Sequence, residues 1–273
     1  MICDTIGQVT GENLYMLNGK TGRSFWMNEL LKRITQKKHE FDGYKNVPAA
    51  LIKNLYEWAK IRATYNSNAI EGNTLTEGET ALIVEKNMTV AGRTINEHLE
   101  AINYAHAVDV IKKMAAEKSR QDLKFDDILA IHHIILNKID DTHAGKLRTV
   151  AVRILGSSVP RPNYLKLPEL MEEFIEWLHT ATGHPAQIAV DVHLKFVSIH
   201  PFTDGNGRIA RLLFDLLLLQ EGYPLIVIEN QTRPAYIQGI ERALLYNDPI
   251  EYYTVMYKAI EKSLDDYLDA VKE

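Results

Sequence analysis

The stretch "IHPFTDGNGRIAR", residues 199–211, is the part of the sequence from which fold and function can both be argued. The helical pattern before it is not expected to pass His200, because Pro201 disfavours helix at the residue that precedes it. The letters "TDGNG" then predict a turn, since Asp and Asn tolerate unusual backbone angles and Gly has no Cβ. A second helix starts at "RIAR". We therefore predict a helix–loop–helix unit with His200 at the end of its first helix.

The residue types in this unit predict a particular chemistry. Backbone amides that lead into a helix N-terminus bind anions such as phosphate. Arg208 and Arg211 are three residues apart, so both lie on one face of the first turn. Asp204 offers a carboxylate of the kind that holds Mg²⁺ together with phosphate oxygens, and His200 can act as a base near neutral pH. Each feature alone is common in ordinary structure, but all of them in this order indicate phosphoryl or nucleotidyl chemistry.

Around this unit, most of the chain carries apolar residues at helical spacing. The segment "RIARLLFDLLLLQEG" (208–222) is apolar on nearly all sides, which predicts a buried central helix. The expected helices cover residues 47–70, 94–117, 125–139, 167–181, 185–200, 208–222, 233–246 and 249–270.

Strand signals are few. "NLYMLNGKTGRSFWM" (13–27) has an Asn-Gly pair between short apolar stretches, which predicts a hairpin. "LRTVAVRILGSSVPRP" (147–162) alternates briefly before Gly, Ser and Pro, which predicts a short β-hairpin flap. The expected fold is mostly α, with a helical core, this flap and an N-terminal helical extension. We divide the chain into an N-terminal region, 1–115, and a core, 116–273.

Composition limits the class of protein. The chain has 273 residues, of which 46% are hydrophobic, so it can bury a sizeable core. Its 31 basic and 36 acidic residues give a net charge of −5, which argues against a nucleic-acid binder. Cys3 has no second cysteine to pair with. The start lacks a secretory signal pattern, and the most apolar run, 212–228, is interrupted by charges and a proline. We expect a cytoplasmic protein with no membrane contact, and a homo-oligomer is compatible with the sequence.

A second motif lies upstream, at "SNAIEGN" (67–73). Ser67 and Glu71 are four residues apart at the end of an expected helix, which Gly72 terminates. A carboxylate there faces the negative end of the helix dipole. An exposed Glu tolerates this placement at a cost of about 0.3 kcal/mol or somewhat more. Alternatively, Glu71 has a cationic partner elsewhere in the fold, and the residues alone leave both interpretations open.

The letters "HPFTDGNGRIAR" match every specified position of HPFx[D/E]GNGRxxR, the signature of Fic-domain proteins, so the chain resembles the Fic/Doc family. The resemblance extends to "HAGKLR" (143–148), "ILGSSVPRP" (154–162) and the helix that contains His193, and covers roughly residues 120–230. It implies a Fic-type helical core. It also implies a protein adenylyltransferase, which transfers AMP from ATP to a Ser, Thr or Tyr hydroxyl of a target protein.

The resemblance implies roles for the matching residues. His200 would deprotonate the target hydroxyl, and Asp204 would hold Mg²⁺ between the α- and β-phosphates of ATP. Phe202 would anchor the loop in the core. The target segment would dock by backbone pairing along the flap at 152–162, which the sequence also allows to be an ordinary connection.

The other signature residues would bind the phosphates. Gly205, Asn206 and Gly207 would cradle them, and Arg208 and Arg211 would bind the β/γ end. The kinase-like branch of the family has Lys near the second glycine of the motif. This chain has Gly207 there, which favours nucleotidyl transfer over phosphorylation.

"SNAIEGN" in turn resembles the inhibitory motif of Fic proteins whose inhibitory helix lies N-terminal to the core, the class II arrangement. The resemblance implies that Glu71, in the motif that Ser67 opens, pairs with Arg211. That pair would block productive binding of the ATP γ-phosphate.

Three functions remain open: an auto-inhibited AMP transferase, a hydrolase that removes AMP with Glu71 positioning water, and a non-catalytic nucleotide sensor. The intact His200 argues against the sensor, because binding needs no base. His193 lies two helical turns before His200, and we interpret it as a packed helix histidine rather than half of a metal pair. Tyr236 and Asn247 follow the core, and their place in the chain makes them candidates for the adenine contact.

Overall fold

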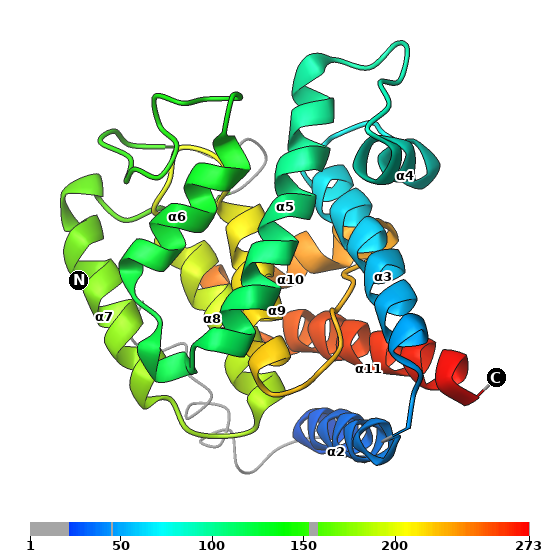
Figure 1. Cartoon of the computed structure of the whole chain (residues 1–273). Helices are drawn as coiled ribbons and strands as arrows, with labels where there is room; N and C mark the ends of the chain where they lie inside the picture. Colours follow the sequence, from blue (N-terminus) through cyan, green and yellow to red (C-terminus); the bar gives the residue numbers. More distant parts are fainter. Residues whose placement is uncertain (1–21, 45, 153–157, 273) are drawn as a thin grey trace.

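The computed structural model describes residues 22–44, 46–152 and 158–272, and this part of the chain is all α (Figure 1). Three short 3₁₀ turns, η2 (Arg120–Asp122), η3 (Tyr164–Lys166) and η4 (Asn230–Thr232), connect the α-helices. The ten α-helices of the described residues are α2 (Gly22–Gly43), α3 (Ala49–Ile70), α4 (Glu77–Lys86), α5 (Ile95–Glu117), α6 (Phe125–Leu136), α7 (Leu167–Thr180), α8 (Pro185–Ile199), α9 (Asn206–Gln220), α10 (Arg233–Tyr246) and α11 (Ile250–Lys272).

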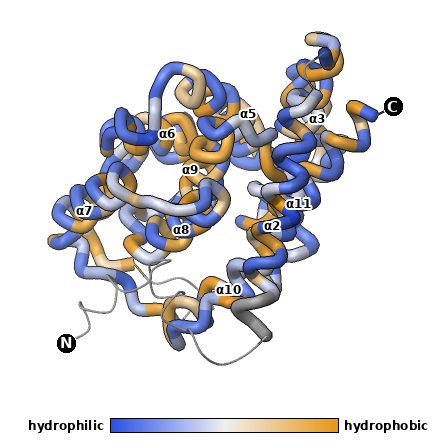
Figure 2. The backbone as a smooth tube through the Cα atoms, turned by 90° about the horizontal axis from the view of Figure 1, so that it is seen from below, coloured by the Kyte–Doolittle hydropathy of each residue, from blue (hydrophilic) through white to orange (hydrophobic). Residues whose placement is uncertain are grey.

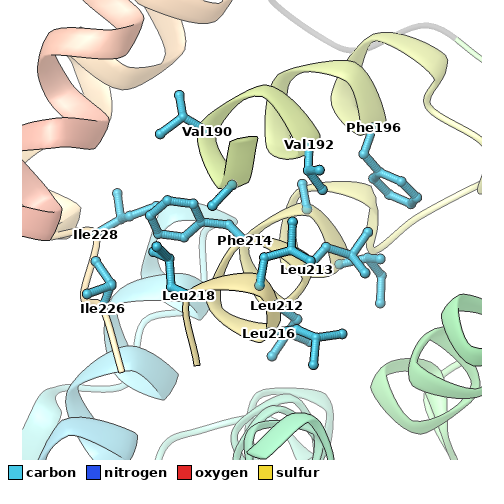
Figure 3. Packing of buried hydrophobic residues seen from close by; sticks show 14 of the residues in the cluster. Val190, Val192, Phe196, Leu212, Leu213, Phe214, Leu216, Leu218, Ile226 and Ile228 are labelled. Atoms are coloured by element: carbon cyan, nitrogen blue, oxygen red, sulfur yellow. The ribbon is translucent and has the colours of Figure 1, made fainter. Parts of the chain in front are cut away.

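The predicted central helix is confirmed as α9. Leu212, Phe214 and Leu216 are fully buried, and α9 packs against α5 and α8. Figure 3 shows side chains of α8 facing those of α9, and Figure 2 shows hydrophobic residues gathered along α9. Each fully buried Leu or Phe contributes about 1.5–3 kcal/mol. The core therefore fixes α9 firmly, and with it the loop at its N-terminus.

The helix α3 brings the upstream motif to the same place. It packs against α5 and also touches α9, and its Ala63 and Ile70 are buried. The end of α3 at Ile70 therefore lies near the start of α9. The helix α5 crosses residue 115 without a break and contacts both α3 and α9. The division into 1–115 and 116–273 stays a prediction.

The hairpin predicted for residues 13–27 is wrong where the structure describes it, because residues 22–27 begin α2. Residues 13–21 lie outside the described part of the chain. Met27, Leu30 and Ile34 are buried, at spacings of three and four residues, and α2 packs against α11. That spacing is the helical period, and burial of this stripe explains why the described residues from 22 onward are helical.

The predicted β-hairpin flap is also corrected. Residues 147–152 and 158–162 contain no strand, and residues 153–157 lie outside the described part of the chain. Arg148 and two prolines account for this difference. Arg148 donates to the carbonyl oxygen of Val150 at 3.0 Å and to that of Pro162 at 2.7 Å. A buried guanidinium therefore bonds carbonyls on both sides of the flap, while Pro160 and Pro162 have no N–H for a ladder.

None of the described helices is long and apolar enough to cross a membrane. The apolar sequence of α9 is interrupted by the acidic residue Asp215.

Candidate active site

His200 ends α8, as predicted. Its φ of 51° places it in the left-handed region, which is uncommon for residues other than glycine. The His200 N–H donates to the Phe196 carbonyl at 3.0 Å, and Arg148 Nε donates to the His200 carbonyl at 2.9 Å. Both backbone polar groups of His200, its N–H and its carbonyl, are therefore held by hydrogen bonds.

The surroundings of His200 keep its imidazole neutral. Burial, followed by the positive charges of Arg161 and Arg148, lowers the pKa of His200 to about 3. Near neutral pH the ring is therefore in the form that can accept a proton.

The signature loop is shaped by Asn206 and Gly205. Asn206 Nδ2 donates to the Phe202 carbonyl at 2.8 Å, and the Phe202 N–H donates to Asn206 Oδ1 at 2.9 Å. Phe202 is fully buried, as predicted. Gly205 precedes α9 with a φ of 78°, a conformation that glycine adopts without strain. The Asn206 side chain thus closes the loop, which leaves the backbone amides of the first turn of α9 available to meet an anion.

Arg208 lies buried between two carboxylates. Its Nη2 donates to Asp204 Oδ2 at 2.9 Å, and its Nη1 donates to Glu100 Oε1 at 3.1 Å. The Arg208 side chain is 3% exposed, whereas that of Asp204 is 66% exposed. The Asp204 carboxylate is therefore accessible to solvent, whereas the Arg208 guanidinium lies buried beneath the loop.

Arg211 is held by the upstream motif. Its Nη2 donates to Glu71 Oε1 at 2.6 Å, and its Nε donates to Ser67 Oγ at 2.8 Å. Nη2 also donates to the Ser67 carbonyl at 3.0 Å. Burial by itself lowers the pKa of Arg211, but the negative charge of Glu71 beside it raises the pKa above its usual value. Of the two interpretations of Glu71 that the sequence left open, the structure therefore supports the one with a cationic partner, which is Arg211.

The Glu71 carboxylate lies directly over the first turn of α9. A Cβ placed on Gly207 would collide with Glu71 Oε1 and would lie 3.2 Å from Arg211 Nη1. Gly207 therefore makes the room that Glu71 fills. The carboxylate occupies the position at the N-terminus of α9 where an anion would be expected to bind.

A chain of buried hydrogen bonds continues from Arg211. Arg211 Nη1 donates to the Tyr236 hydroxyl at 3.5 Å, and that hydroxyl lies 2.7 Å from His193 Nε2. The Tyr252 hydroxyl lies 2.8 Å from His193 Nδ1. His193 is thus a packed helix histidine. Tyr236 is 2% exposed, so its ring is not placed for an adenine contact, and Asn247 ends α10 with a left-handed φ of 51°.

The donor set suits a metal held mainly by phosphates. Among the described residues, no group of three or more His, Cys, Asp or Glu side chains is arranged to hold a metal ion. Asp204 supplies one exposed carboxylate next to the loop. Mg²⁺ commonly binds through one or two carboxylates, substrate phosphates and water, so these residues fit that ion with a bound nucleotide.

Sequence reasoning missed residues that shape the site, among them Glu100 and Arg148. Glu100 comes from the second turn of α5, and nothing in its local sequence marks it as a partner of Arg208. Arg148 closes the quoted "HAGKLR" segment, and its guanidinium, 2% exposed, bonds backbone carbonyls among the described residues, a use that only the fold reveals. A helical Glu and a loop Arg carry no local signal of this kind.

Buried histidines predict how stability depends on pH. Burial lowers the pKa of His132 to about 4, that of His200 to about 3, and that of His193 well below its usual value. In the unfolded chain these rings titrate near ~6.5, so below that pH the unfolded state binds more protons and the free energy of unfolding falls. Each ring removes about 1.4 kcal/mol per pH unit. Burial raises the pKa of Asp215, whose contribution has the opposite sign.

We therefore expect the free energy of unfolding to fall by about 2–3 kcal/mol between pH 6 and pH 5. Urea denaturation at pH 7, 6 and 5 measures it. The variant His39→Asn is the control, since that side chain is exposed. A free energy of unfolding that stays constant from pH 7 to pH 5 would contradict the burial of these rings in neutral form.

Comparison with known proteins places this site in a family. Residues 122–218 match the model of the Fic/DOC family. The chain is 31% identical over 247 residues to protein adenylyltransferase fic-1 of Caenorhabditis elegans, covering 89% of this chain and 48% of that protein. It is 34% identical over 245 residues to protein adenylyltransferase Fic of Nematostella vectensis, covering 88% and 56%. The chain spans about half the length of the curated relatives that it matches.

Solved structures agree with this placement. Fic-1 of C. elegans superposes with a TM-score of 0.83 at 28% identity, covering 99% of this chain and 81% of that chain. A Fic-domain signalling protein of Bacteroides thetaiotaomicron shares the fold, with a TM-score of 0.79 at 24% identity over 88% of this chain and 98% of that one. The chain belongs to the Fic/DOC family and is related to the animal Fic adenylyltransferases.

Proposed function

We propose that this protein is an adenylyltransferase that transfers AMP from ATP to a Ser, Thr or Tyr hydroxyl of a target protein, and that Glu71 restrains it. The observation that carries the proposal is that a neutral His200 lies one loop away from the N-terminus of α9. The expected phosphate-binding position at that N-terminus is occupied by the Glu71 carboxylate. A base, a phosphate site and a competing carboxylate in one place suit a regulated transfer from a nucleotide.

In the proposed reaction the His200 imidazole accepts the proton of the target hydroxyl. The hydroxyl oxygen then forms a bond to the α-phosphorus of ATP, and the bond from that phosphorus to its bridging oxygen breaks. Pyrophosphate leaves with the electron pair of the broken bond, and AMP stays on the target. The amides of the first turn of α9, at Asn206, Gly207 and Arg208, stabilise the charge that develops on the phosphates.

Asp204 is the residue that would hold Mg²⁺. When bound, the ion neutralises charge on the α- and β-phosphates and so stabilises the departing pyrophosphate. Arg208 steadies Asp204 through the 2.9 Å bond to Oδ2. Arg211 offers its guanidinium to the β/γ end once Glu71 leaves it.

The inhibitory arrangement is of the class II kind, with the inhibitory helix N-terminal to the core. The Glu71–Arg211 contact of 2.6 Å supports it, because one guanidinium cannot pair fully with Glu71 and with the γ-phosphate together. Ser67 supports it too, since its hydroxyl and carbonyl hold Arg211 in the direction of α3.

The target would dock at the flap, residues 152–162, of which the structure describes 152 and 158–162. Arg148 supports this proposal, because it joins both sides of the flap to the His200 carbonyl. A change in the flap is thereby linked to the base. A cytoplasmic location and a homo-oligomer stay predictions from the sequence.

The transfer is tested with two labelled nucleotides. The protein is incubated with ATP labelled at the α-phosphate, in parallel with ATP labelled at the γ-phosphate, and with a cell lysate as a source of targets. Protein-bound label from the α-position only, with a mass increase equal to AMP less one water, supports the proposal. Label from the γ-position would show phosphate transfer instead, and ATP binding without protein-bound label would favour a nucleotide sensor.

The reverse reaction is the second candidate. The Glu71 side chain is 38% exposed, although its carboxylate is bound to Arg211, so water has access to it. A carboxylate with access to water can orient that water for attack on a protein-bound AMP. Release of AMP from a modified target by the parent protein, in the absence of ATP, would support this hydrolase.

Asp204→Ala is expected to remove most of the Mg²⁺-dependent activity, and extra Mg²⁺ should restore it poorly. Asp204 is the exposed carboxylate of the signature loop, so the variant loses the protein's own oxygen ligand. Titration of Mg²⁺ against transfer rate measures the effect. The control is Asp126→Ala, an exposed acid in the first turn of α6. An unchanged Mg²⁺ midpoint in the Asp204 variant would contradict the assignment.

A further inference from the structure

A histidine outside the signature lies under the phosphate loop. His132 comes from α6 and is fully buried. Its ring stacks on Phe202, with centroids 3.7 Å apart and planes 4° from parallel. A Cβ on Gly205 would come within 3.5 Å of His132 Nε2. The ring therefore contacts the loop at Phe202 and closely approaches it at Gly205.

The hydrogen bonds of His132 determine which ring nitrogen carries its proton. The Gly145 N–H donates to His132 Nδ1 at 2.9 Å, so Nδ1 is the acceptor. In the neutral ring the other nitrogen then carries the hydrogen. His132 Nε2 lies 3.1 Å from the carbonyl oxygen of Asp204 and donates to it. Both nitrogens are satisfied by one tautomer, and each bond reaches a different segment.

We propose that His132 is a positioning residue for the metal and phosphate site, acting through the Asp204 carbonyl. This inference rests on the proposed function. The Asp204 side chain is 66% exposed, and Arg208 holds only its Oδ2 end, so its direction also depends on its backbone. The Nε2–H bond fixes that backbone from below. Partners that orient a metal ligand in this way typically change metal affinity or activity by about 10–100-fold when they are removed.

The second bond of His132 connects this loop with the base. Gly145 has a φ of 70°, and three residues later Arg148 donates to the His200 carbonyl. The segment from Gly145 to Arg148 thus runs from His132 to His200. His132 therefore bonds to the backbone of Asp204 and, through the segment 145–148, is connected to the backbone of His200. Its ring touches neither reacting group.

Two substitutions separate the two bonds. His132→Gln places an amide nitrogen about as far from the backbone as Nε2, so it can still donate to the Asp204 carbonyl. His132→Asn is shorter and places an oxygen near the position of Nδ1, so it can still accept from Gly145. Each variant loses the ring and one bond, and we expect their melting temperatures to fall by similar amounts. His133→Asn is the matched control, because His133 is the next residue on α6 and its side chain is exposed.

The readouts are calorimetric binding of ATP at a series of Mg²⁺ concentrations and the Mg²⁺ midpoint of transfer. His132→Asn should raise the Mg²⁺ midpoint by about tenfold or more, while His132→Gln should stay within about threefold of the parent protein. If His132→Asn is too unstable to purify, His132→Phe replaces it, since it keeps the ring on Phe202 and loses both bonds.

Equal Mg²⁺ midpoints for the Gln and Asn variants would overturn the inference, even with lowered melting temperatures, because the role of His132 would then be structural only. In that case the parent protein would still bind ATP and transfer AMP, so the proposed function would stand. A parent protein that binds no ATP at any Mg²⁺ concentration would overturn the proposed function and this inference together.

Discussion

His200→Ala should lower the rate of AMP transfer by about 10²–10⁴-fold, the usual range for loss of a general base. ATP binding should stay near its parent value, because the phosphates meet the amides of α9 and the two arginines rather than the imidazole. The separation follows from the structure. His200 lies at the end of α8, whereas the expected phosphate-binding position lies at the start of α9.

The measurement pairs single-turnover transfer with calorimetric ATP binding. Both are best made in a chain that also carries Glu71→Gly, so that the base is tested without the inhibitory pair. His143→Ala is the matched control, since it removes an exposed histidine whose Nδ1 bonds only to Asp140 in the described structure. Transfer at the parent rate by the His200 variant would show that another group takes the proton.

The pKa of His200 adds a second way to examine the base. A free-enzyme pKa lowered to about 3 means that the ring stays neutral well below pH 6. The value of kcat/KM reports ionisations of the free enzyme, so its acid limb should not appear near ~6.5, where an ordinary histidine titrates. An acid limb at that pH would place the base in a more open setting than the structure shows.

The sequence predicted the helices of the core well, because their apolar periodicity is strong. Predicted spans 94–117 and 233–246 correspond to α5 and α10 within a residue. The helix α4 was missed although Thr76 and Glu79 form a capping box, which is a sequence signal for a helix start. Its ten residues are too few to display a long periodic pattern, so the cap was the only available sign.

The candidate site was predictable where its residues are adjacent in the chain. Between His200 and Arg211, one loop and one helix start fix the relative places of the groups, so spacing alone was informative. His132, Glu100 and Arg148 come from other elements and act through a ring nitrogen, a carboxylate and a guanidinium that meet the loop only after folding. Their positions depend on the packing of α5 and α6 around α9, which no local pattern encodes.

Glu71→Gly should increase the rate of auto-modification or target modification by about 10- to 100-fold. Repression of that size needs roughly 1.4–2.8 kcal/mol. A fully exposed pair supplies only about 0.2–1 kcal/mol, so the contact must be partly buried. The structure meets this requirement on one side, since the Arg211 side chain is 3% exposed and that of Glu71 is 38% exposed.

The same burial predicts a cost in stability. Removing one partner of a fully buried pair costs about 3–5 kcal/mol, because the other charge is stranded. The cost here should be smaller, since water reaches Glu71 and Arg211 keeps its bonds to Ser67 Oγ and the Ser67 carbonyl. Glu71→Gln is the matched variant, because its amide can still accept from Arg211 but has no charge. It should lie between the parent and the Gly variant in rate.

The stranded guanidinium has a replacement partner in the γ-phosphate of ATP. Glu71→Gly should therefore melt below the parent protein without nucleotide, and ATP with Mg²⁺ should restore more of its stability than it adds to the parent. A ligand that binds only the folded state stabilises it by about 2.7 kcal/mol at a concentration of 100 Kd, so the shift is measurable by thermal denaturation. The two readouts divide the hypotheses. A faster and ATP-stabilised variant supports inhibition by Glu71, whereas a variant that binds ATP more tightly but releases AMP from a modified target more slowly would make Glu71 catalytic and favour the hydrolase.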